Sequence, residues 1–534
     1  MNTLKRCSIF FLGMAIWFSG AGAGFAADDY WTNAVDGDFS VGANWTDGTA
    51  PGSADIAYFN KNAGSPYTVT FDVTVTNNAF RVRNDRVAFN LNGLTYDVLS
   101  ATIGTSSGDN GWLSLSNGTV SVTNLFNLGD VSGATGTMVL DGSAAIIRGN
   151  GAEYVRVGRG GYGRLIVTNG GSLMITNKLL NISIDAESGE GHVIVSGAGS
   201  VLQVWNMGAV GYNSATAPTS TLEVLNGGFF QIFGVGNFNV RDQVIVDGTN
   251  SVLTSNARCF WNGAGTGAYI RVRNGGRLNF LLDQFSLGGS GNPGRFDVTD
   301  GGSAYLTGTP CLGGSDTSQS GPGGFMMIGT NSIVICVNRL LVWTNSTVML
   351  NNGTLWFGAD PDLRGTLIGN GTIGSTSTVR TIKSTGWLVP GGTNSAGTLI
   401  VTNANLVFTN SAANTTNGML FLEFSESAHD SVILPSTNNS INLANATLSY
   451  SLISGSSFRP LTPSFMDFLI ATNITGAVFS DNMTSLLSAV APPFVQYTYG
   501  IVTVGASDYG GLYSGYQALR LTTSMSAGTV VSFH

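Results

Sequence analysis

Arginine side chains form two clusters in this 534-residue sequence, one around Arg156 and one around Arg271. Arg271 and Arg273 are two residues apart, and in a β-strand this spacing puts both side chains on one face. A guanidinium group donates paired hydrogen bonds to carboxylates and similar oxyanions. We therefore identify Arg156, Arg271 and Arg273 as candidate contacts for an acidic glycan. The alternative is a solvated outer face, where arginines protect a sheet from unwanted pairing.

Two tryptophans near the start of the chain are candidates for a different kind of binding. Trp31 and Trp45 lie close to Tyr30 and Phe59, and an exposed indole ring can stack on the face of a sugar. Aromatic residues in an irregular terminal segment can instead plug the open end of a repetitive core. The sequence leaves both interpretations of Trp31 and Trp45 open.

Carboxylates could supply the acid and base of a polysaccharide hydrolase or lyase, which would place the arginine face at an active site. Three aspartates occupy equivalent positions before a turn glycine, namely Asp141, Asp247 and Asp300. Asparagine occupies the same position in other copies of the repeat, at Asn92, Asn117, Asn169, Asn226, Asn274 and Asn352. Asn and Asp both favour turns, so this exchange indicates turn geometry, and no catalytic residue is assigned.

The histidines give no support to metal chemistry. His192, His429 and His534 are isolated, and no paired-histidine or Cys-x-x-Cys motif occurs. The acidic segments 36–38 and 360–362 lack the spacing of a calcium loop and fit ordinary turns. We expect no metal and no cofactor.

A repeated turn signature determines the expected fold. The pattern h-x-V-x-N-G-G-x-L, where h is apolar, recurs about every 26 residues, with clear copies at 165–173, 222–230, 270–278 and 296–304. Apolar residues alternate on either side of the turn, as expected for half-buried strands. Stacking such units joins their apolar faces into one core. We predict an all-β fold, a right-handed parallel β-helix (β-solenoid) of eleven or twelve rungs and about 55 Å, in preference to a β-propeller.

The ends of the chain depart from the repeat. Lys5 and Arg6, an apolar run and the small residues before Ala27 predict a signal peptide over 1–26, cleaved after Ala26. We expect an irregular N-terminal cap over 27–60, the parallel β-helix over 61–425 and a C-terminal β-rich module over 426–534. The predicted module includes a short helix near 483–490.

Composition restricts the partners. Loss of Lys5 and Arg6 with the signal peptide takes the formal charge from -8 to -10, and without a basic patch we expect no nucleic-acid partner. No apolar run in the mature chain is long enough to span a membrane. Three cysteines remain, and Cys311 and Cys336 are about one repeat apart, so they are either buried as small hydrophobic residues or paired as a disulfide.

Segments at both ends carry a family resemblance. The segment 31–45, with Pro51, Asp55 and Phe59, resembles the opening module of secreted bacterial proteins with autotransporter-associated β-strand repeats, and 390–401 is similar to their closing proline-glycine motif. The stretches 422–432, 458–460 and 474–479 resemble the β-module that follows in such proteins. The resemblance implies a passenger-like parallel β-helix at an extracellular address. The chain lacks the family's membrane barrel and a sorting tail, so we expect release or non-covalent surface attachment.

These features lead to three hypotheses of function. The leading one is a secreted or cell-surface, non-enzymatic β-solenoid of the adhesin, matrix or scaffold type, which makes multivalent contacts to polysaccharide or other surface components. The second is a polysaccharide-active enzyme, a lyase or hydrolase, on the arginine face. The third is a carbohydrate-binding module centred on Trp31 and Trp45.

Overall fold

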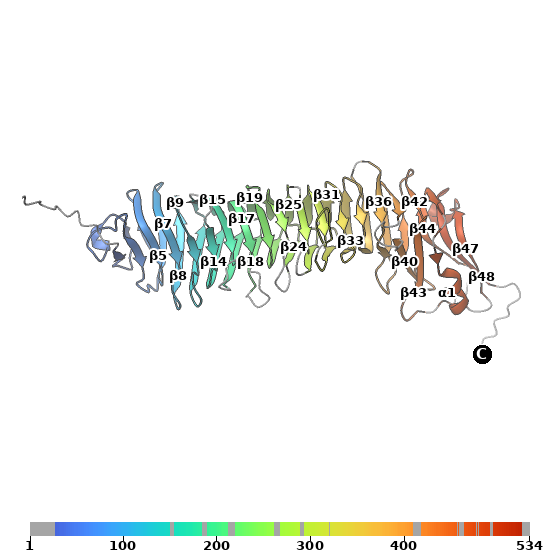
Figure 1. Cartoon of the computed structure of the whole chain (residues 1–534), viewed down its shortest axis with the longest axis horizontal. Coiled ribbons are helices and arrows are strands. Elements are labelled where there is room, and N and C mark those ends of the chain that lie inside the picture. The colour runs from blue at the N-terminus through green and yellow to red at the C-terminus, as the bar shows by residue number, and fades with distance from the viewer. Residues whose placement is uncertain are drawn as a thin grey trace, which may run out of the picture.

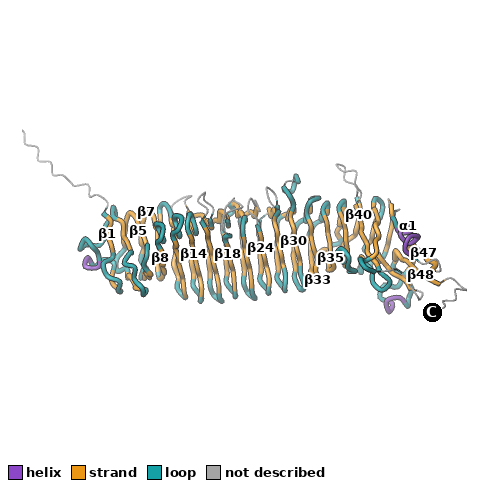
Figure 2. The backbone as a smooth tube through the Cα atoms, turned by 90° about the horizontal axis from the view of Figure 1, so that it is seen from below, coloured by secondary structure: helices purple, strands orange, loops and turns teal. Residues whose placement is uncertain are grey.

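The computed structural model describes residues 27–149, 154–183, 189–211, 219–260, 268–282, 284–288, 293–319, 321–376, 378–409, 418–456, 458, 464–476, 478, 480–491 and 495–525. Its strands are formed by residues of alternating polarity. In β14 (Tyr162–Thr168), for example, buried Leu165 and Val167 alternate with half-buried residues. The strands stack into a long rod, the parallel β-solenoid that the repeat predicted (Figures 1 and 2). The expected signal peptide over 1–26 lies outside the described residues.

Three parallel β-sheets line the sides of the rod, and each rung between the two terminal ones contributes one strand segment to each sheet. Sheet 1 contains β2 (Gly37–Asp38), β4 (Tyr67–Thr70), β6 (Arg86–Asn90), β8 (Asn110–Ser116), β11 (Thr135–Asp141), β14, β16 (Glu190–Ser196), β18 (Thr221–Leu225), β21 (Gln243–Asp247), β24 (Tyr269–Arg273), β27 (Gly294–Val298), β30 (Gly324–Ile328), the first parts of β33 (Thr347–Phe357) and β35 (Thr366–Ser375), β37 (Trp387–Pro390), β40 (Gly418–Phe424), β43 (Ala446–Leu452) and β46 (Ser480–Asp481).

Sheet 2 follows sheet 1 around each rung. It contains the first parts of β5 (Val75–Val82) and β7 (Thr95–Ile103), β9 (Gly118–Val122), β12 (Ala144–Gly149), the first parts of β15 (Ser172–Ile182) and β17 (Val201–Val210), β19 (Phe229–Ile232), β22 (Val252–Ser255), β25 (Arg277–Phe280), β28 (Ser303–Leu306), β31 (Ile333–Cys336), the second parts of β33 and β35, β38 (Thr398–Thr402), β41 (Ser431–Ile433) and β44 (Ser464–Ala471).

Sheet 3 completes each rung. It contains β1 (Asp28–Tyr30), β3 (Ile56–Phe59), the second parts of β5 and β7, β10 (Phe126–Leu128), β13 (Tyr154–Val157), the second parts of β15 and β17, β20 (Asn237–Val240), β23 (Arg258–Phe260), β26 (Gln284–Leu287), β29 (Thr309–Leu312), β32 (Leu341–Val342), β34 (Asp362–Leu363), β36 (Arg380–Ser384), β39 (Ala404–Phe408), β42 (Ser440–Asn442) and β45 (Asn473–Thr475).

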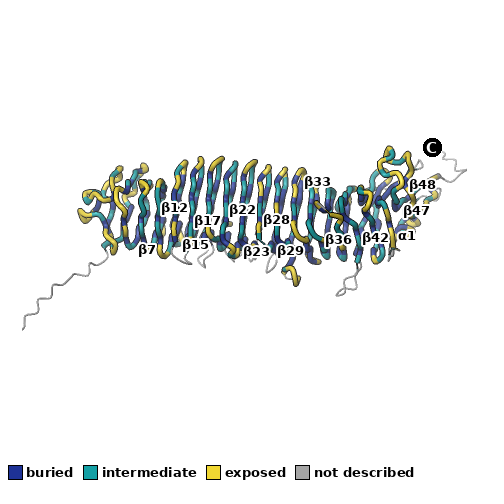
Figure 3. The backbone as a smooth tube through the Cα atoms, turned by 90° about the horizontal axis from the view of Figure 1, so that it is seen from above, coloured by how far each residue is buried: buried dark blue, intermediate teal, exposed yellow. Residues whose placement is uncertain are grey.

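The repeated Asn-Gly turn forms the corner between sheets 1 and 2. Its first residue adopts a left-handed conformation, with φ between 51° and 58°, at Asn92, Asn117, Asn169, Asn226, Asn274, Asp300 and Asn352. Asparagine and aspartate tolerate this region better than other side chains. Buried residues from all three sheets form one core along the rod, and exposed residues gather at the corners and at both ends (Figure 3).

The described solenoid has about 15 turns, or roughly 70 Å at one strand spacing per turn, more than the eleven or twelve predicted. Some rungs are shorter than the 26-residue repeat, and those near the C-terminal end are longer, as in the pairing of Thr398 with Ser431. Val75 pairs with Tyr96, 21 residues later, and Thr347 pairs with Thr366, 19 residues later. A search for one fixed period therefore missed these rungs.

The terminal segments continue the sheets. In the cap, β1 pairs with β3 in sheet 3. Beyond residue 425, the strands from β41 to β45 continue all three sheets. The parallel order ends where β48 (Gln517–Met525) pairs antiparallel with both β44 and β47 (Val495–Thr503).

The described chain contains little helix. The predicted short helix is confirmed as α1 (Met483–Val490), and η1 (Gly42–Asn44) and η2 (Asp508–Gly511) are 3-10 turns. None of the described helices has the length and apolar character needed to cross a bilayer.

Candidate functional site

Arg271 and Arg273 lie on the outer face of β24, as their spacing predicted. The Arg271 guanidinium is 4.6 Å from the centre of the Tyr269 ring, and its Nε donates a hydrogen bond of 2.7 Å to the Tyr269 hydroxyl. Arg273 Nε is 2.7 Å from Oδ2 of Asp247 in the preceding rung. Both guanidinium groups therefore have partners within the protein.

Arg156 lies on β13 in sheet 3, whereas Arg271 and Arg273 lie in sheet 1, several rungs further along the rod. Its guanidinium is 5.0 Å from the centre of the Tyr154 ring. The structure therefore does not bring Arg156 together with the other two arginines in one site.

Trp31 and Trp45 are buried inside the N-terminal cap, with exposed fractions of 0% and 2%. Their rings meet edge to face at 5.1 Å, Trp31 stacks on Tyr67, and Trp45 Nε1 donates a hydrogen bond of 2.7 Å to the Phe39 carbonyl. Neither indole offers a free face to a sugar in this arrangement, which is the packing of an end plug. Ligand binding by these tryptophans stays a prediction that would require the cap to open.

The corner aspartates are engaged in holding rungs together. Asp247 accepts a hydrogen bond of 2.7 Å from the side-chain amide of Asn274, in addition to its contact with Arg273. Asp141 accepts an equivalent bond of 2.7 Å from Asn169. The predicted equivalence of the three aspartates with the turn asparagines holds for Asp300, which shares their left-handed conformation. It is wrong for Asp141 and Asp247, which pair as strand residues with Thr168 and Arg273 and are not left-handed.

A second group of carboxylates fastens the loop that follows β37. Asp430 accepts hydrogen bonds from the backbone N–H groups of Gly397 (2.9 Å) and Glu423 (2.8 Å), and Glu423 accepts one from the N–H of Asn394. Burial, opposed by these two hydrogen bonds, raises the pKa of Asp430 from its ordinary value of 3.8 to about 8. Because both oxygens of Asp430 bind the backbone, its role here is structural.

Cys259, Cys311 and Cys336 are buried free thiols. Cys311 lies in sheet 3 and Cys336 in sheet 2, so the spacing of about one repeat does not place them in the same column. Burial raises the pKa of both thiols to about 12, which keeps them protonated at neutral pH. In the part of the chain that the structure describes, no group of three or more His, Cys, Asp or Glu side chains could hold a metal ion.

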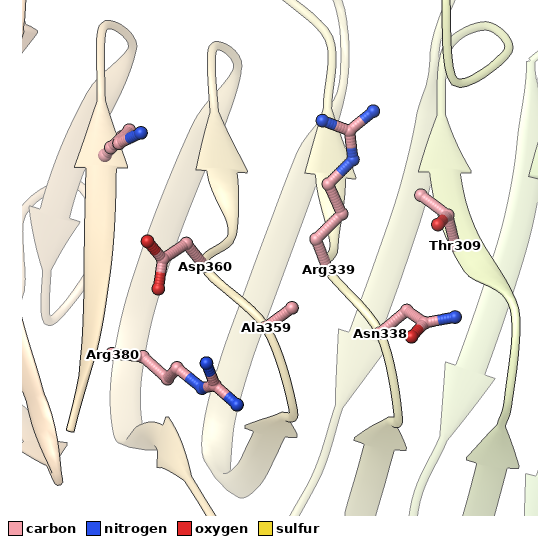
Figure 4. Close-up of a pocket in the computed structure, with 7 residues that line it drawn as sticks. Thr309, Asn338, Arg339, Ala359, Asp360 and Arg380 are labelled. Atoms are coloured by element: carbon pink, nitrogen blue, oxygen red, sulfur yellow. The ribbon is translucent and has the colours of Figure 1, made fainter. Parts of the chain in front are cut away.

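A shallow groove of about 550 Å³ lies where the chain enters sheet 3, across the rungs of β29, β32, β34 and β36 (Figure 4). We call it the sheet 3 groove. It is lined by Thr309, Asn338, Arg339, Ala359, Asp360, Arg380 and Lys383. Three of these residues are cations and one is a carboxylate. In a chain of net charge -8, this is a local concentration of positive charge.

Sequence reasoning missed this groove because its cations are far apart in the chain. Leu341 pairs with Asp362, and Asp362 pairs with Lys383, at intervals of 21 residues. This interval is shorter than the repeat of about 26, so alignment on the turn glycines did not place Arg339 and Lys383 on one side of the rod. Strand register, rather than motif spacing, is the signal that finds them.

Comparison with known proteins leaves the chain without an assigned family. No protein-family model and no curated protein matches the sequence. Among solved structures, the crystal structure of a TibC-catalysed, hyper-glycosylated TibA fragment is similar at 14% identity, over 76% of this chain and 99% of that chain, with a TM-score of 0.30. At that score the similarity carries no conclusion about function.

Proposed function

We propose that this protein is a non-enzymatic rod of the adhesin, matrix or scaffold type, secreted or displayed at a cell surface, where it contacts polysaccharide or other surface components. The observation that carries the proposal is the regular stacking of about 15 turns, which repeats shallow polar faces along roughly 70 Å. Contacts that are weak individually become strong together when they are held on one rigid body.

The bonding of the outer residues supports this role. The corner carboxylates Asp141 and Asp247 and the guanidinium groups of Arg271 and Arg273 are all engaged in contacts within or between rungs. These groups stiffen the rod. The resemblance of 31–59 and 390–401 to secreted autotransporter-associated repeat proteins also favours an extracellular structural role.

Binding at graded ligand density tests the proposal. The purified chain would be passed over polysaccharide surfaces of increasing density, and retention and dissociation would be measured. A multivalent rod should dissociate more slowly as density rises, because one molecule then makes several contacts. A dissociation rate that does not change with density would contradict the proposal.

A further inference from the structure

The sheet 3 groove contains three cations that pair with no carboxylate among the described residues. Elsewhere in the described chain, several arginines form ion pairs with aspartates of the same or an adjacent rung, as Arg83 does with Asp109 and Arg295 with Asp297. Arg339, Arg380 and Lys383 form no ion pair with any described carboxylate. The groove is distinguished by the convergence of three such cations beside a single carboxylate.

Two carboxylates of this region have other partners. Asp362, which lies opposite Lys383 in the strand register, binds Arg364 at 2.7 Å. Asp360, at the groove itself, accepts a hydrogen bond of 3.0 Å from the backbone N–H of Thr381. Asp360 keeps its negative charge, so the groove holds three cations against one carboxylate and has positive charge left for an anionic group from solution.

Unused hydrogen-bond donors point to the same conclusion. Among the described residues no group accepts a hydrogen bond from the Arg380 guanidinium, and because its Nε is buried, the terminal nitrogens are the donors that a ligand can reach. Arg339 donates only to the backbone carbonyl of Asp316, at 3.3 Å, among the described residues. A guanidinium has five N–H donors in a fixed plane, which suits a carboxylate or sulfate oxygen pair.

The remaining lining residues suit a sugar. The hydroxyl of Thr309 and the amide oxygen of Asn338 can bond to sugar hydroxyl groups, and the Asp360 carboxylate can accept from them. Ala359 has a small side chain and lies between Arg339 and Arg380, so the floor stays open (Figure 4). The volume of about 550 Å³ lies within the usual range of small-ligand sites.

We propose that the sheet 3 groove binds a short stretch of an acidic polysaccharide, with Arg339, Arg380 and Lys383 holding its carboxylate or sulfate groups. The inference rests on the proposed function, since it makes this groove one of the glycan contacts of the rod. The overall negative charge of the chain repels acidic polymers at long range, so binding is concentrated at this groove and weakens with added salt.

Calorimetric titration of the intact chain with an oligogalacturonate tests the proposal, and a sulfated oligosaccharide in a second arm tells a carboxylate ligand from a sulfate ligand. The double variant Arg339→Gln/Lys383→Gln should bind about tenfold more weakly or worse, because two charge-assisted contacts are lost. Ala359→Trp should have a similar effect by filling the floor without a change of charge. The matched control Arg148→Gln/Arg277→Gln removes two exposed cations outside the groove and should bind nearly as well as the parent.

Three results would contradict the proposal that the sheet 3 groove binds an acidic polysaccharide. In the first, the control variant Arg148→Gln/Arg277→Gln loses as much affinity as the groove variant. In the second, the parent binds neither acidic oligosaccharide. In the third, the parent binds polyglutamate equally tightly, which would indicate general attraction of anions. Thermal melting of each variant checks the fold, and if Ala359→Trp unfolds, the charge variants decide alone. If retention on neutral polysaccharide depends on density and no acidic polysaccharide binds, the groove proposal is wrong and the proposed function is still supported. Cleavage of the polymer would instead contradict the proposed non-enzymatic function.

Discussion

At the residue scale, aromatic side chains close the N-terminal end of the core. Trp31 and Trp45 pack among Phe39, Phe59 and Tyr67 and leave almost no surface exposed. A solenoid needs such a plug because its first rung would otherwise expose apolar side chains and unpaired backbone groups to water. The aromatic content of the segment was readable from the sequence, but its burial was not.

Trp45→Ala should destabilise the N-terminal end by about 3 to 5 kcal/mol, the usual cost of removing a buried tryptophan. Hydrogen exchange over residues 27–90 would detect the loss as faster exchange there than in the middle of the rod. The plug interpretation is wrong if Trp45→Ala leaves exchange and thermal stability unchanged and abolishes retention on a polysaccharide.

The buried carboxyl of Asp430 links stability to pH. Its pKa rises from 3.8 to about 8 on folding, chiefly by burial, so the folded chain holds a proton that the unfolded chain releases. Its contribution to stability is therefore complete below about pH 4 and is lost as the pH rises through about 8.

Melting temperatures of the parent and of Asp430→Asn, measured between pH 5 and pH 9, would test this linkage. Asn cannot ionise, so the variant should lose less stability than the parent across that interval, even if it starts lower because its amide nitrogen cannot accept a backbone N–H. Parallel pH profiles of the two proteins would rule out a role for Asp430.

The candidate site shows what residue types alone cannot reveal. The spacing of Arg271 and Arg273 correctly placed them on one face, because alternation along a strand is a local property. The partners Tyr269 and Asp247, which occupy those guanidinium groups, were not foreseen, since the Asp247 contact depends on register between rungs. The sheet 3 groove depends on the same register and was missed for the same reason.

At the element scale, the two glycines of the Asn-Gly-Gly turn have different structural roles. Gly170 has a φ of 79°, and a Cβ there would meet no atom within 4 Å. A Cβ on Gly171 would lie 2.4 Å from the carbonyl oxygen of Leu140 in the preceding rung. The first glycine supplies a left-handed conformation, and the second permits close approach of neighbouring rungs.

Gly170→Ala should therefore cost about 1 to 2 kcal/mol, the strain of a left-handed alanine. Gly171→Ala should cost about 3 kcal/mol, because the backbone of two rungs must move apart. Chemical denaturation of the pair measures the difference. Equal stability of the two variants would refute this division of roles.

Strand and turn formation were predictable because both depend on residue type and on neighbours in the sequence. The alternation around Leu165 and the left-handed Asn169 follow from residue type and neighbours alone. The number of rungs was underestimated because short rungs, such as the one from Thr347 to Thr366, keep the register with fewer corner residues. Sheet geometry fixes the spacing between strands but leaves the corner lengths free.

At the scale of the whole molecule, an antiparallel hairpin covers the C-terminal end of sheet 2. The C-terminal hairpin of β47 and β48 covers β44 in antiparallel fashion, and Leu519 and Leu521 add to the core. An antiparallel edge does not continue a parallel stack, so it protects against end-to-end growth.

A chain that stops after Ala491 should therefore self-associate, since it exposes the edge of β44 and apolar surface that β48 normally covers. Light scattering during size-exclusion chromatography would show mass that rises with concentration. A chain that stops after Met525 keeps the hairpin and serves as the control. A monomeric 1–491 chain would contradict the capping role.

The central claim, that the rod binds polysaccharide without cleaving it, is tested most directly by one assay of the intact protein. Polysaccharides, neutral, acidic and sulfated, would be incubated with the chain, and retention would be measured together with new reducing ends and absorbance at 235 nm. The account predicts retention on at least one acidic polymer with no release of product. Product that accumulates with time, and is lost on substitution of Arg271 or Arg273, would contradict it and identify a polysaccharide-degrading enzyme.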